Sequence, residues 1–404
     1  IIGVLIFMGT TSGWVQIADN STQLITRFTL GPVPMFIMMG ALFFHTGLAI
    51  RVFDGLDVIF GKLPGRLCFL TVAGGTLFST LTGSSMANTA MLGSLMVPEM
   101  QKRGYNWQMS MGPILGTGGL AMIIPPSALG VLLASVASID VGKLLIAGFI
   151  PGFVLAGLYS LMILLQLKMN PESAPAYDVE MPSISERIKL VCVNILPMGI
   201  IVFMVVGFII LGWATPTEAA AFGVLGVIVV AAGFRALSFE SIKTATHATV
   251  KVAAMVFFII MSSTVFSQLL AFSGASAGLL EWAISFGISK YWVLLLMFFI
   301  LIALGMFMDA TSMMLITVPI FFPLAEQLGF DLIWFGLFVL MTFEMAGTTP
   351  PFGLLLYVML GVAPKGTTLY QVAAAAFPFL VCDAILILLM VKWPMLALWL
   401  PSLM

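Results

Sequence analysis

The sequence predicts an all-α integral membrane protein, a polytopic helical bundle of two inverted repeats, each with a re-entrant helical hairpin and a helix broken by Pro-Pro. Three observations lead to this fold class. Of the 404 residues, 61% are hydrophobic and only 8% are charged, whereas a soluble domain carries about 25% charged residues. Two long apolar segments are interrupted at their centres by polar residues. The same order of hairpin, polar turn and paired prolines occurs twice.

The composition also limits the partners. A net charge of −1 offers no basic surface to nucleic acid, so we expect no nucleic-acid partner, and the main surroundings should be the lipid bilayer. Cys68, Cys192 and Cys382 lie too far apart for a disulfide framework or a metal site. Because the chain opens on Ile1 inside an apolar stretch, we expect the first helix to be truncated.

The two interrupted segments are 68–100 and 291–325, with polar tips at 82–89 and 305–312. Each arm is too short to cross the hydrocarbon core, which needs about 20 apolar residues. Backbone that leaves the helix at membrane depth must be buried in protein or line a cavity. The sequence therefore predicts two re-entrant hairpins whose tips are candidate sites.

A shift of 225 residues superimposes the two patterns without a gap. It aligns Pro98 with Pro323, Gly104 with Gly329, Pro125-Pro126 with Pro350-Pro351, and 84–89 with 309–314. Lys and Arg gather at the base of the first hairpin but not of the second, and short cytoplasmic loops collect such residues. The hairpins should therefore enter from opposite sides, as in transporters with inverted repeats and sites at the midplane.

This pattern predicts five regions. They are N-terminal scaffold helices (1–67), the first hairpin and broken helix of a transport domain (68–142), scaffold and cytoplasmic connecting helices (143–290), the second hairpin and broken helix (291–366), and a C-terminal helix (367–404).

The first candidate site pairs the tip that holds Ser84, Ser85 and Asn88 with the helix broken at Pro125-Pro126. Proline has no N–H and excludes the carbonyl four residues back, so carbonyls before the break are free. Together with Ser and Asn oxygens they form a neutral set of donors suited to Na+. The alternative is that a tip serine only caps the next arm and the prolines only bend a helix.

The second candidate site pairs Asp309 with the helix broken at Pro350-Pro351. An acid inside a membrane segment is a functional candidate by default, and Asp309 can also be the N-cap of the arm that follows. Glu344 is either a structural partner or a substrate-facing group. Glu218 lies in Thr215-Pro216-Thr217-Glu218, which has the pattern of a capping box.

We expect a secondary transporter and no enzyme. The sequence contains no Ser-His-Asp grouping and no phosphate-binding Gly-Lys-Ser/Thr loop, which argues against a hydrolase or an ATP-driven pump. Two alternatives stay open. An ion channel can also use two polar re-entrant loops, and an intramembrane enzyme can use Asp309 or a tip serine if it has a paired acid or base.

The chain resembles the large membrane subunit (the DctM-like M subunit) of tripartite ATP-independent periplasmic (TRAP) transporters over nearly its whole length. The residues that carry the resemblance are Ile124-Pro125-Pro126-Ser127, Thr215-Pro216-Thr217-Glu218-Ala219-Ala220-Ala221, Gly305–Asp309, and Glu344 with Thr349-Pro350-Pro351. The resemblance implies Na+-coupled uptake of an organic acid by an elevator in the bacterial inner membrane, with Na+ as coupling ion and no other cofactor. It also implies a small DctQ-like membrane subunit and a periplasmic substrate-binding protein as partners.

The resemblance further implies ligands at each site. The first Na+ site uses Ser84, Ser85 and Asn88 with backbone around Ala121, Ile124 and Pro126, and the second uses Gly305, Met308, Asp309 and Thr349 with backbone around Ala346. Ala121 and Ala346 stand where the family commonly has glycine, so the neighbouring Gly119 and Gly347 are further candidates. Candidates for substrate contact are Thr89, Ser127, Thr311, Ser312 and Glu344.

Overall fold

A computed structural model describes residues 2–26, 30–61, 63–82, 85–175, 182–274, 278 and 289–404. Every regular element in this part of the chain is a helix. Five of the helices are long and apolar enough to cross a membrane, and the number rises to seven when two sharply bent pairs are each taken as one span. The predicted all-α, multi-span fold is confirmed.

The first hairpin consists of α5 (Arg66–Thr82) and α6 (Ser85–Lys102). The helix α7 (Trp107–Ile123) follows, and after the two prolines α8 (Ala128–Ala137) continues at an angle of 43°. Asn106 caps α7 by accepting a hydrogen bond from the Met109 N–H at 2.8 Å. The predicted helix break at Pro-Pro is confirmed in this repeat.

The second hairpin consists of α17 (Lys290–Gly305) and α18 (Ala310–Gln327). It is followed by α19 (Leu332–Thr348), which Asp331 caps, and, after Pro350-Pro351, by α20 (Leu354–Val362). With the shift of 225 residues, the bounds of α6 and α7 coincide with those of α18 and α19. Both Pro-Pro bonds are cis. The repeat in the sequence is therefore also a repeat in the order and bounds of the helices. The inverted arrangement of the two repeats and the opposite insertion of the two hairpins stay predictions.

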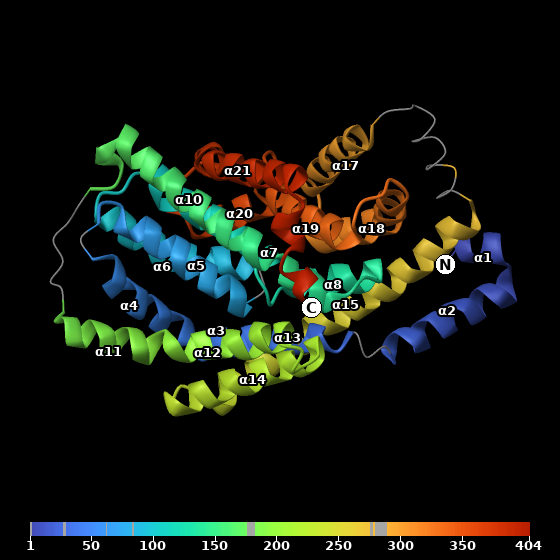
Figure 1. Cartoon of the computed structure of the whole chain (residues 1–404), viewed down its shortest axis with the longest axis horizontal. Helices are drawn as coiled ribbons and strands as arrows, with labels where there is room; N and C mark the ends of the chain where they lie inside the picture. Colours follow the sequence, from blue (N-terminus) through green and yellow to red (C-terminus); the bar gives the residue numbers. More distant parts are fainter. Residues whose placement is uncertain are drawn as a thin grey trace.

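The repeats pack on each other reciprocally. The helix α8 of the first repeat lies against α18 of the second, and α20 of the second lies against α6 of the first. The long helices α7 and α19 touch each other between them. Two helices that follow the repeats, α10 (Phe149–Met169) and α21 (Leu369–Lys392), also pack together. The hairpins, the broken helices and these two long helices thus form one layer, in the upper part of Figure 1.

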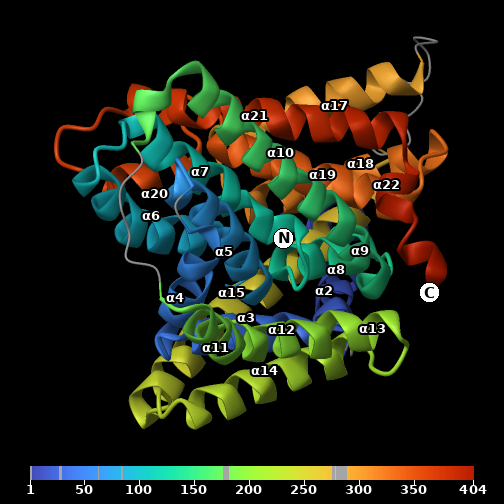
Figure 2. The same ribbon diagram turned by 60° about the vertical axis from the view of Figure 1, so that its left-hand side comes forward.

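A second layer lies below it in Figures 1 and 2. Its inner helices, α3 (Pro32–His45) and α4 (Leu48–Phe60), meet at 70° and pack against α5. Outside them lie α11 (Ile184–Asn194), α12 (Leu196–Val202), α13 (Phe208–Ile210) and α14 (Pro216–Gly233). The helix α15 (Phe239–Phe272) runs past α3, α8 and α18 toward α1 (Ile2–Met8) and α2 (Thr10–Ile25).

The remaining helices of the described chain are short. They are α9 (Val141–Ala147) and α22 (Met395–Leu398), the 3-10 turns η2 (Pro171–Ser173) and η4 (Pro401–Leu403), and the π-helical turn η3 (Phe203–Gly207) between α12 and α13. The capping box predicted at Thr215–Glu218 is confirmed: the Thr215 hydroxyl accepts from the Glu218 N–H, and the Glu218 carboxylate accepts from the Thr215 N–H at 2.8 Å. Glu218 is therefore accounted for by helix capping.

The outer helices expose large apolar side chains. Phe203 is 54% exposed, and Leu225 and Val229 on α14 are 55% and 69% exposed. In water such a continuous apolar face would be unfavourable, but in a bilayer it is the expected surface because lipid tails are as apolar as leucine.

Candidate functional site

The tip of the second hairpin is organised by Asp309. Its backbone is extended, and its carboxylate accepts hydrogen bonds from the Thr311 N–H at 2.9 Å, the Ser312 N–H at 3.2 Å and the Ser312 hydroxyl at 2.5 Å. The capping role predicted for Asp309 is confirmed. Its ion-binding role stays a prediction that is compatible with the cap, because a carboxylate has about four lone-pair sites.

The tip of the first hairpin lies at the start of α6. Gly83 and Ser84, the latter a predicted ion ligand, fall outside the described residues. Ser85 begins α6 and is 5% exposed, and Asn88, one turn later, is fully buried. The Asn88 amide donates to the Ser79 hydroxyl at 3.0 Å and to the Thr117 carbonyl at 3.1 Å. These bonds tie the tip of α6 to α5 and α7.

Three oxygens on this part of α6 are buried without a partner. Ser85 Oγ, Asn88 Oδ1 and Thr89 Oγ1 have no hydrogen-bond partner among the described residues. Positions three and four residues apart share one face of a helix. Because an unsatisfied buried polar group costs about 1–3 kcal/mol, three of them on one face indicate a place for a ligand that accepts electron pairs.

Each helix break stands next to a hairpin. At the first break, Ile124 is buried and extended (φ −75°, ψ 123°), and Ala121 and Pro126 are buried beside it. At the second, Gly305 approaches Ala346 so closely that an added Cβ would lie 2.3 Å from the Ala346 Cβ. The structure thus brings together the backbone at the end of α17 and the backbone before Pro350-Pro351, as the second predicted site requires.

Gly347 and Thr349 complete the second break. Gly347 and Met308 both line a cavity between the two layers of helices. Thr349 is the C-cap residue of α19, and its hydroxyl donates to the Met345 carbonyl at 2.6 Å. Gly119, the glycine proposed for the first site, lies under the side chain of Glu344.

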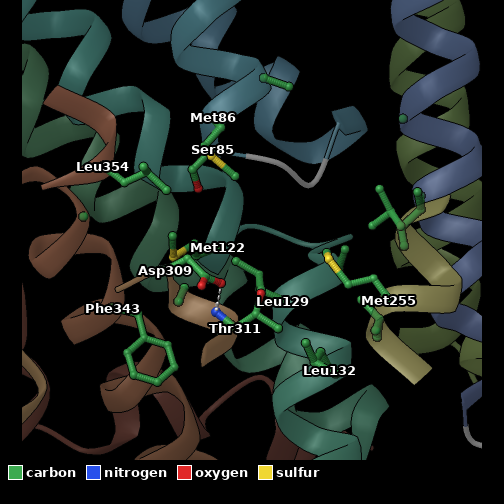
Figure 3. A pocket seen from close by; sticks show the side chains of 18 of the residues that line it. Ser85, Met86, Met122, Leu129, Leu132, Met255, Asp309, Thr311, Phe343 and Leu354 are labelled. Carbon is green, nitrogen blue, oxygen red and sulfur yellow. Dashed lines mark hydrogen bonds between the residues drawn. The ribbon is translucent and has the colours of Figure 1, made fainter. Parts of the chain in front are cut away.

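A cavity of about 500 Å³ lies between the two layers. Ser85 of the first hairpin and Asp309 of the second face it, as Figure 3 shows, together with Met122 before the first break. The opposite wall comes from α3, with Phe44 and His45, and from α15, with Met255. Most of its lining is apolar and a few polar groups converge in it, which is the usual composition of a small-molecule site of this size.

The candidates for substrate contact divide into two groups. Thr311 lines the cavity. Ser312 is the next residue along α18, and its hydroxyl donates a hydrogen bond to the Asp309 carboxylate. Ser127 is buried and caps α8, accepting from the Gly130 N–H and donating to the Met122 carbonyl. Thr89 is buried against Gly118, and Glu344 faces away from the cavity. Of the five candidates, Thr311 is the one that lines the cavity in this conformation.

Sequence reasoning missed two groups. Asp383 on α21 and Tyr159 on α10 are the neighbours of Glu344, with the Tyr159 hydroxyl donating to Asp383 at 2.5 Å and lying 3.3 Å from Glu344 Oε1. The signal for Asp383 was present: it is a lone acid in the middle of an apolar helix, as Asp309 is in its hairpin. His45, interpreted as isolated, lies on the cavity wall.

The fold and the site define a class of protein, the polytopic membrane transporter, in which two helical hairpins and two broken helices form one side of a cavity and α3 and α15 form the other. Comparison with known proteins agrees. The family described as "Tripartite ATP-independent periplasmic transporter, DctM component" matches residues 1–396. The chain therefore belongs to the DctM family of TRAP transporter large permease proteins.

Individual relatives match over similar lengths. Proteins named C4-dicarboxylate TRAP transporter large permease protein DctM are 32% identical in Pseudomonas aeruginosa (93% of this chain, 87% of that protein) and 30% identical in Rhodobacter capsulatus (94% and 88%). The crystal structure of the Alcanivorax borkumensis YdaH transporter has the same fold, with a TM-score of 0.67 at 15% identity over 96% of this chain and 90% of that chain.

Proposed function

We propose that this chain is the large permease subunit of a Na+-coupled transporter that imports an organic acid by an elevator mechanism. The observation that carries the proposal is the cavity of about 500 Å³, which both hairpin tips share with the α3–α15 wall. The two relatives named above are C4-dicarboxylate permeases, and a small carboxylate is the substrate class that we assign to this chain.

Na+ coupling is supported by the chemistry of the tips. The unpartnered oxygens of Ser85 and Asn88 are uncharged, and the carbonyl of Ala121 cannot bond to residue 125 because proline has no N–H. Oxygen ligands suit hard cations. Among the described residues no three His, Cys, Asp or Glu side chains gather into a metal site, so the donors at the first tip favour an ion of low charge.

Coupling to Na+ also has an energetic reason. Each negative charge that moves inward opposes an inside-negative potential by about 2.3 kcal/mol per 100 mV. A carboxylate substrate therefore needs at least one Na+ per negative charge to cancel this electrical work. One more Na+ is needed for the membrane potential to drive uptake. Two separate ion sites, one at each hairpin, are the minimum for a monocarboxylate.

The partners that we propose follow from the family. They are a small DctQ-like membrane subunit and a periplasmic protein that delivers the substrate, with the assembly in the bacterial inner membrane. The exposed apolar side chains of α12 and α14, among them Ile200 and Leu225, offer a surface that lipid or the small subunit can cover.

The elevator is supported by the layered packing. Both hairpins, both broken helices, α10 and α21 pack together, so they can move as one body against the layer of α3, α4 and α11–α15. This proposal takes α10 out of the scaffold region 143–290 that the sequence predicted, because α10 packs on α5, α7 and α21. The cavity lies between the layers, and a displacement of one layer changes the side from which it is open.

The test begins with the periplasmic binding protein that we propose as the partner of this chain. A thermal-shift screen against mono- and dicarboxylates identifies the substrate, and its labelled form is then used for uptake into proteoliposomes that contain the complete transporter. We expect uptake that needs external Na+. Equal uptake in Na+-free buffer, driven by a pH gradient alone, would refute the Na+ coupling.

A further inference from the structure

Two adjoining hollows follow one face of α10, and they share no lining residue with the cavity at the hairpin tips. Their volumes are about 470 Å³ and about 330 Å³. Both are bordered by the stacked rings of Phe60 and Phe69, whose centroids are 6.4 Å apart. We name the two hollows together the α5–α10 groove. Its residues on α10 include Phe153, Ala156, Gly157, Ser160, Leu164 and Lys168.

The groove follows the line along which α10 packs against α5. Its residues on α10 recur every three or four positions, a spacing that keeps side chains on one side of a helix. The opposite wall comes from α5, with Val72 and Thr76. At one end the groove is bordered by Leu63 and Pro64, in the connection from α4 to α5. The groove therefore reaches from the connection between the two layers to the middle of the hairpin arm.

Small and satisfied side chains make the groove open and apolar. Ala73 on α5 and Ala156 and Gly157 on α10 line the same hollow. An added Cβ at Gly157 would meet no atom within 4 Å, so this position faces open space. The hydroxyls of Thr76 and Ser160 donate to carbonyls of their own helices at 2.7 Å and 2.9 Å. Both hydroxyls are thus satisfied without a ligand, and the space between the helices suits an apolar group.

One end of the groove carries a cation. Lys168 lies in the last turn of α10 and is exposed, and it is the one charged side chain among the described residues that line the groove. It forms no ion pair with a described residue, Glu172 one turn later included. This end adjoins Pro64, just before the base of the first hairpin, which the sequence predicts to be cytoplasmic.

The length of the groove matches one leaflet of a bilayer. Phe153 and Lys168 are 15 residues apart, or about 22 Å along the helix axis. A leaflet with its headgroups is about 20–22 Å deep, which is half of a bilayer. A phospholipid has the same order of parts as the groove, with an apolar chain in the interior and a charged phosphate at the surface.

We propose that the α5–α10 groove binds one anionic phospholipid, with an acyl chain between α5 and α10 and the phosphate on Lys168. The lysine ammonium supplies a compact positive charge with three donors, and basic pockets between transmembrane helices suit anionic headgroups of the cytoplasmic leaflet. The chain supplies the dispersion contacts that the walls of an empty hollow lack. The lipid also packs on Leu63 and Pro64, in the segment that joins the two layers. The proposal depends neither on the substrate nor on the coupling ion.

Photolabelling of the complete transporter in lipid nanodiscs tests the site. The probe is phosphatidylglycerol with a diazirine on one acyl chain, diluted into phosphatidylcholine, and mass spectrometry identifies the labelled peptides. We expect labelling of α5 and α10 that saturates as the fraction of the probe rises, whereas labelling of α14 by bulk lipid should rise in proportion. A phosphatidylcholine probe with the same diazirine should label the groove several-fold less.

Two variants address the two parts of the site, each with a matched control. Gly157→Leu places a side chain in the groove, and Gly199→Leu makes the same change on α12, where an added Cβ also meets no atom within 4 Å. Lys168→Ala removes the cation, and Lys102→Ala removes another exposed lysine from the last turn of a helix. Gly157→Leu should reduce labelling of the groove to the level of bulk lipid. Lys168→Ala should reduce it about fivefold, the usual contribution of one lysine to the binding of anionic lipid. Neither control should change it.

Labelling of the groove that does not saturate, or that is unchanged in Gly157→Leu, overturns the proposal. An absence of label from the groove of the complete transporter also overturns it, because a protein such as the small subunit then covers this face. Equal labelling in Lys168→Ala and Lys102→Ala overturns the assignment of the phosphate to Lys168. If Gly157→Leu does not fold, Lys168→Ala and the phosphatidylcholine probe decide.

Discussion

The contact between Gly119 and Glu344 gives a sharp prediction. In Gly119→Ala the new Cβ would lie 2.0 Å from Glu344 Oε1 and 2.1 Å from its Cγ and Cδ, whereas real Cβ contacts are essentially never under 3.0 Å. The whole carboxyl end must therefore move by about an ångström, away from a pocket that it fills between α7 and Tyr159.

The expected cost follows from three contributions. Overpacking a filled interior costs about 1–3 kcal/mol, and loss of the Glu344–Tyr159 contact adds about 1 kcal/mol. Alanine stabilises a helix interior by about 1 kcal/mol relative to glycine. The net loss for Gly119→Ala is about 1–3 kcal/mol. The control is Gly157→Ala on α10, where no atom lies within 4 Å of the added Cβ, and this change should be neutral or stabilising by up to about 1 kcal/mol.

The free energy of unfolding of each variant is measured in mixed micelles by SDS titration. A double-mutant cycle with Glu344→Ala isolates the steric term, because truncating Glu344 removes the atoms that the new Cβ meets. We expect the cost of Gly119→Ala to fall by at least half in that background. An equal cost with and without the Glu344 side chain, or equal effects at Gly119 and Gly157, would refute the reasoning.

Three further predictions concern the two ion sites and the cavity. Asp309→Asn can keep the cap of α18, so we expect it to abolish Na+-dependent uptake while the stability stays near that of the wild type. Asp309→Ala should abolish uptake and also lose about 0.5–2 kcal/mol of stability, because the cap is lost. Uptake by Asp309→Asn with unchanged Na+ dependence contradicts the ion-binding role. Asn88→Ala should raise the Na+ concentration for half-maximal uptake, and an unchanged value removes Asn88 from the first site. Met86 and Met255 line the cavity from opposite layers. We replace both with cysteine in a background without the native cysteines, and we expect uptake to stop when a short bifunctional reagent joins the two. Full uptake by the joined protein leaves a local gate or a channel as the mechanism.

Much of the architecture was predictable from local signals. Helix caps and prolines act within one or two turns, so the sequence already contains the bounds of the repeated helices. The matching bounds of α6 with α18 and of α7 with α19 bear this out. The caps at Asp309 and Thr215 were predictable for the same reason: a side chain that bonds to a backbone N–H two or three residues away needs no tertiary contact.

The sequence by itself thus determined the membrane-spanning helical class, the two hairpins, the two breaks and the caps. Only the tertiary structure decided which side chains share a space. Ser85 and Asp309 meet at one cavity although they are 224 residues apart, and Glu344 turns from that cavity toward Tyr159 and Asp383. The physical reason is that most buried polar groups find their partner only in the packed state. In the interior of a membrane protein that partner comes from whichever helix packs alongside, and no local pattern identifies it.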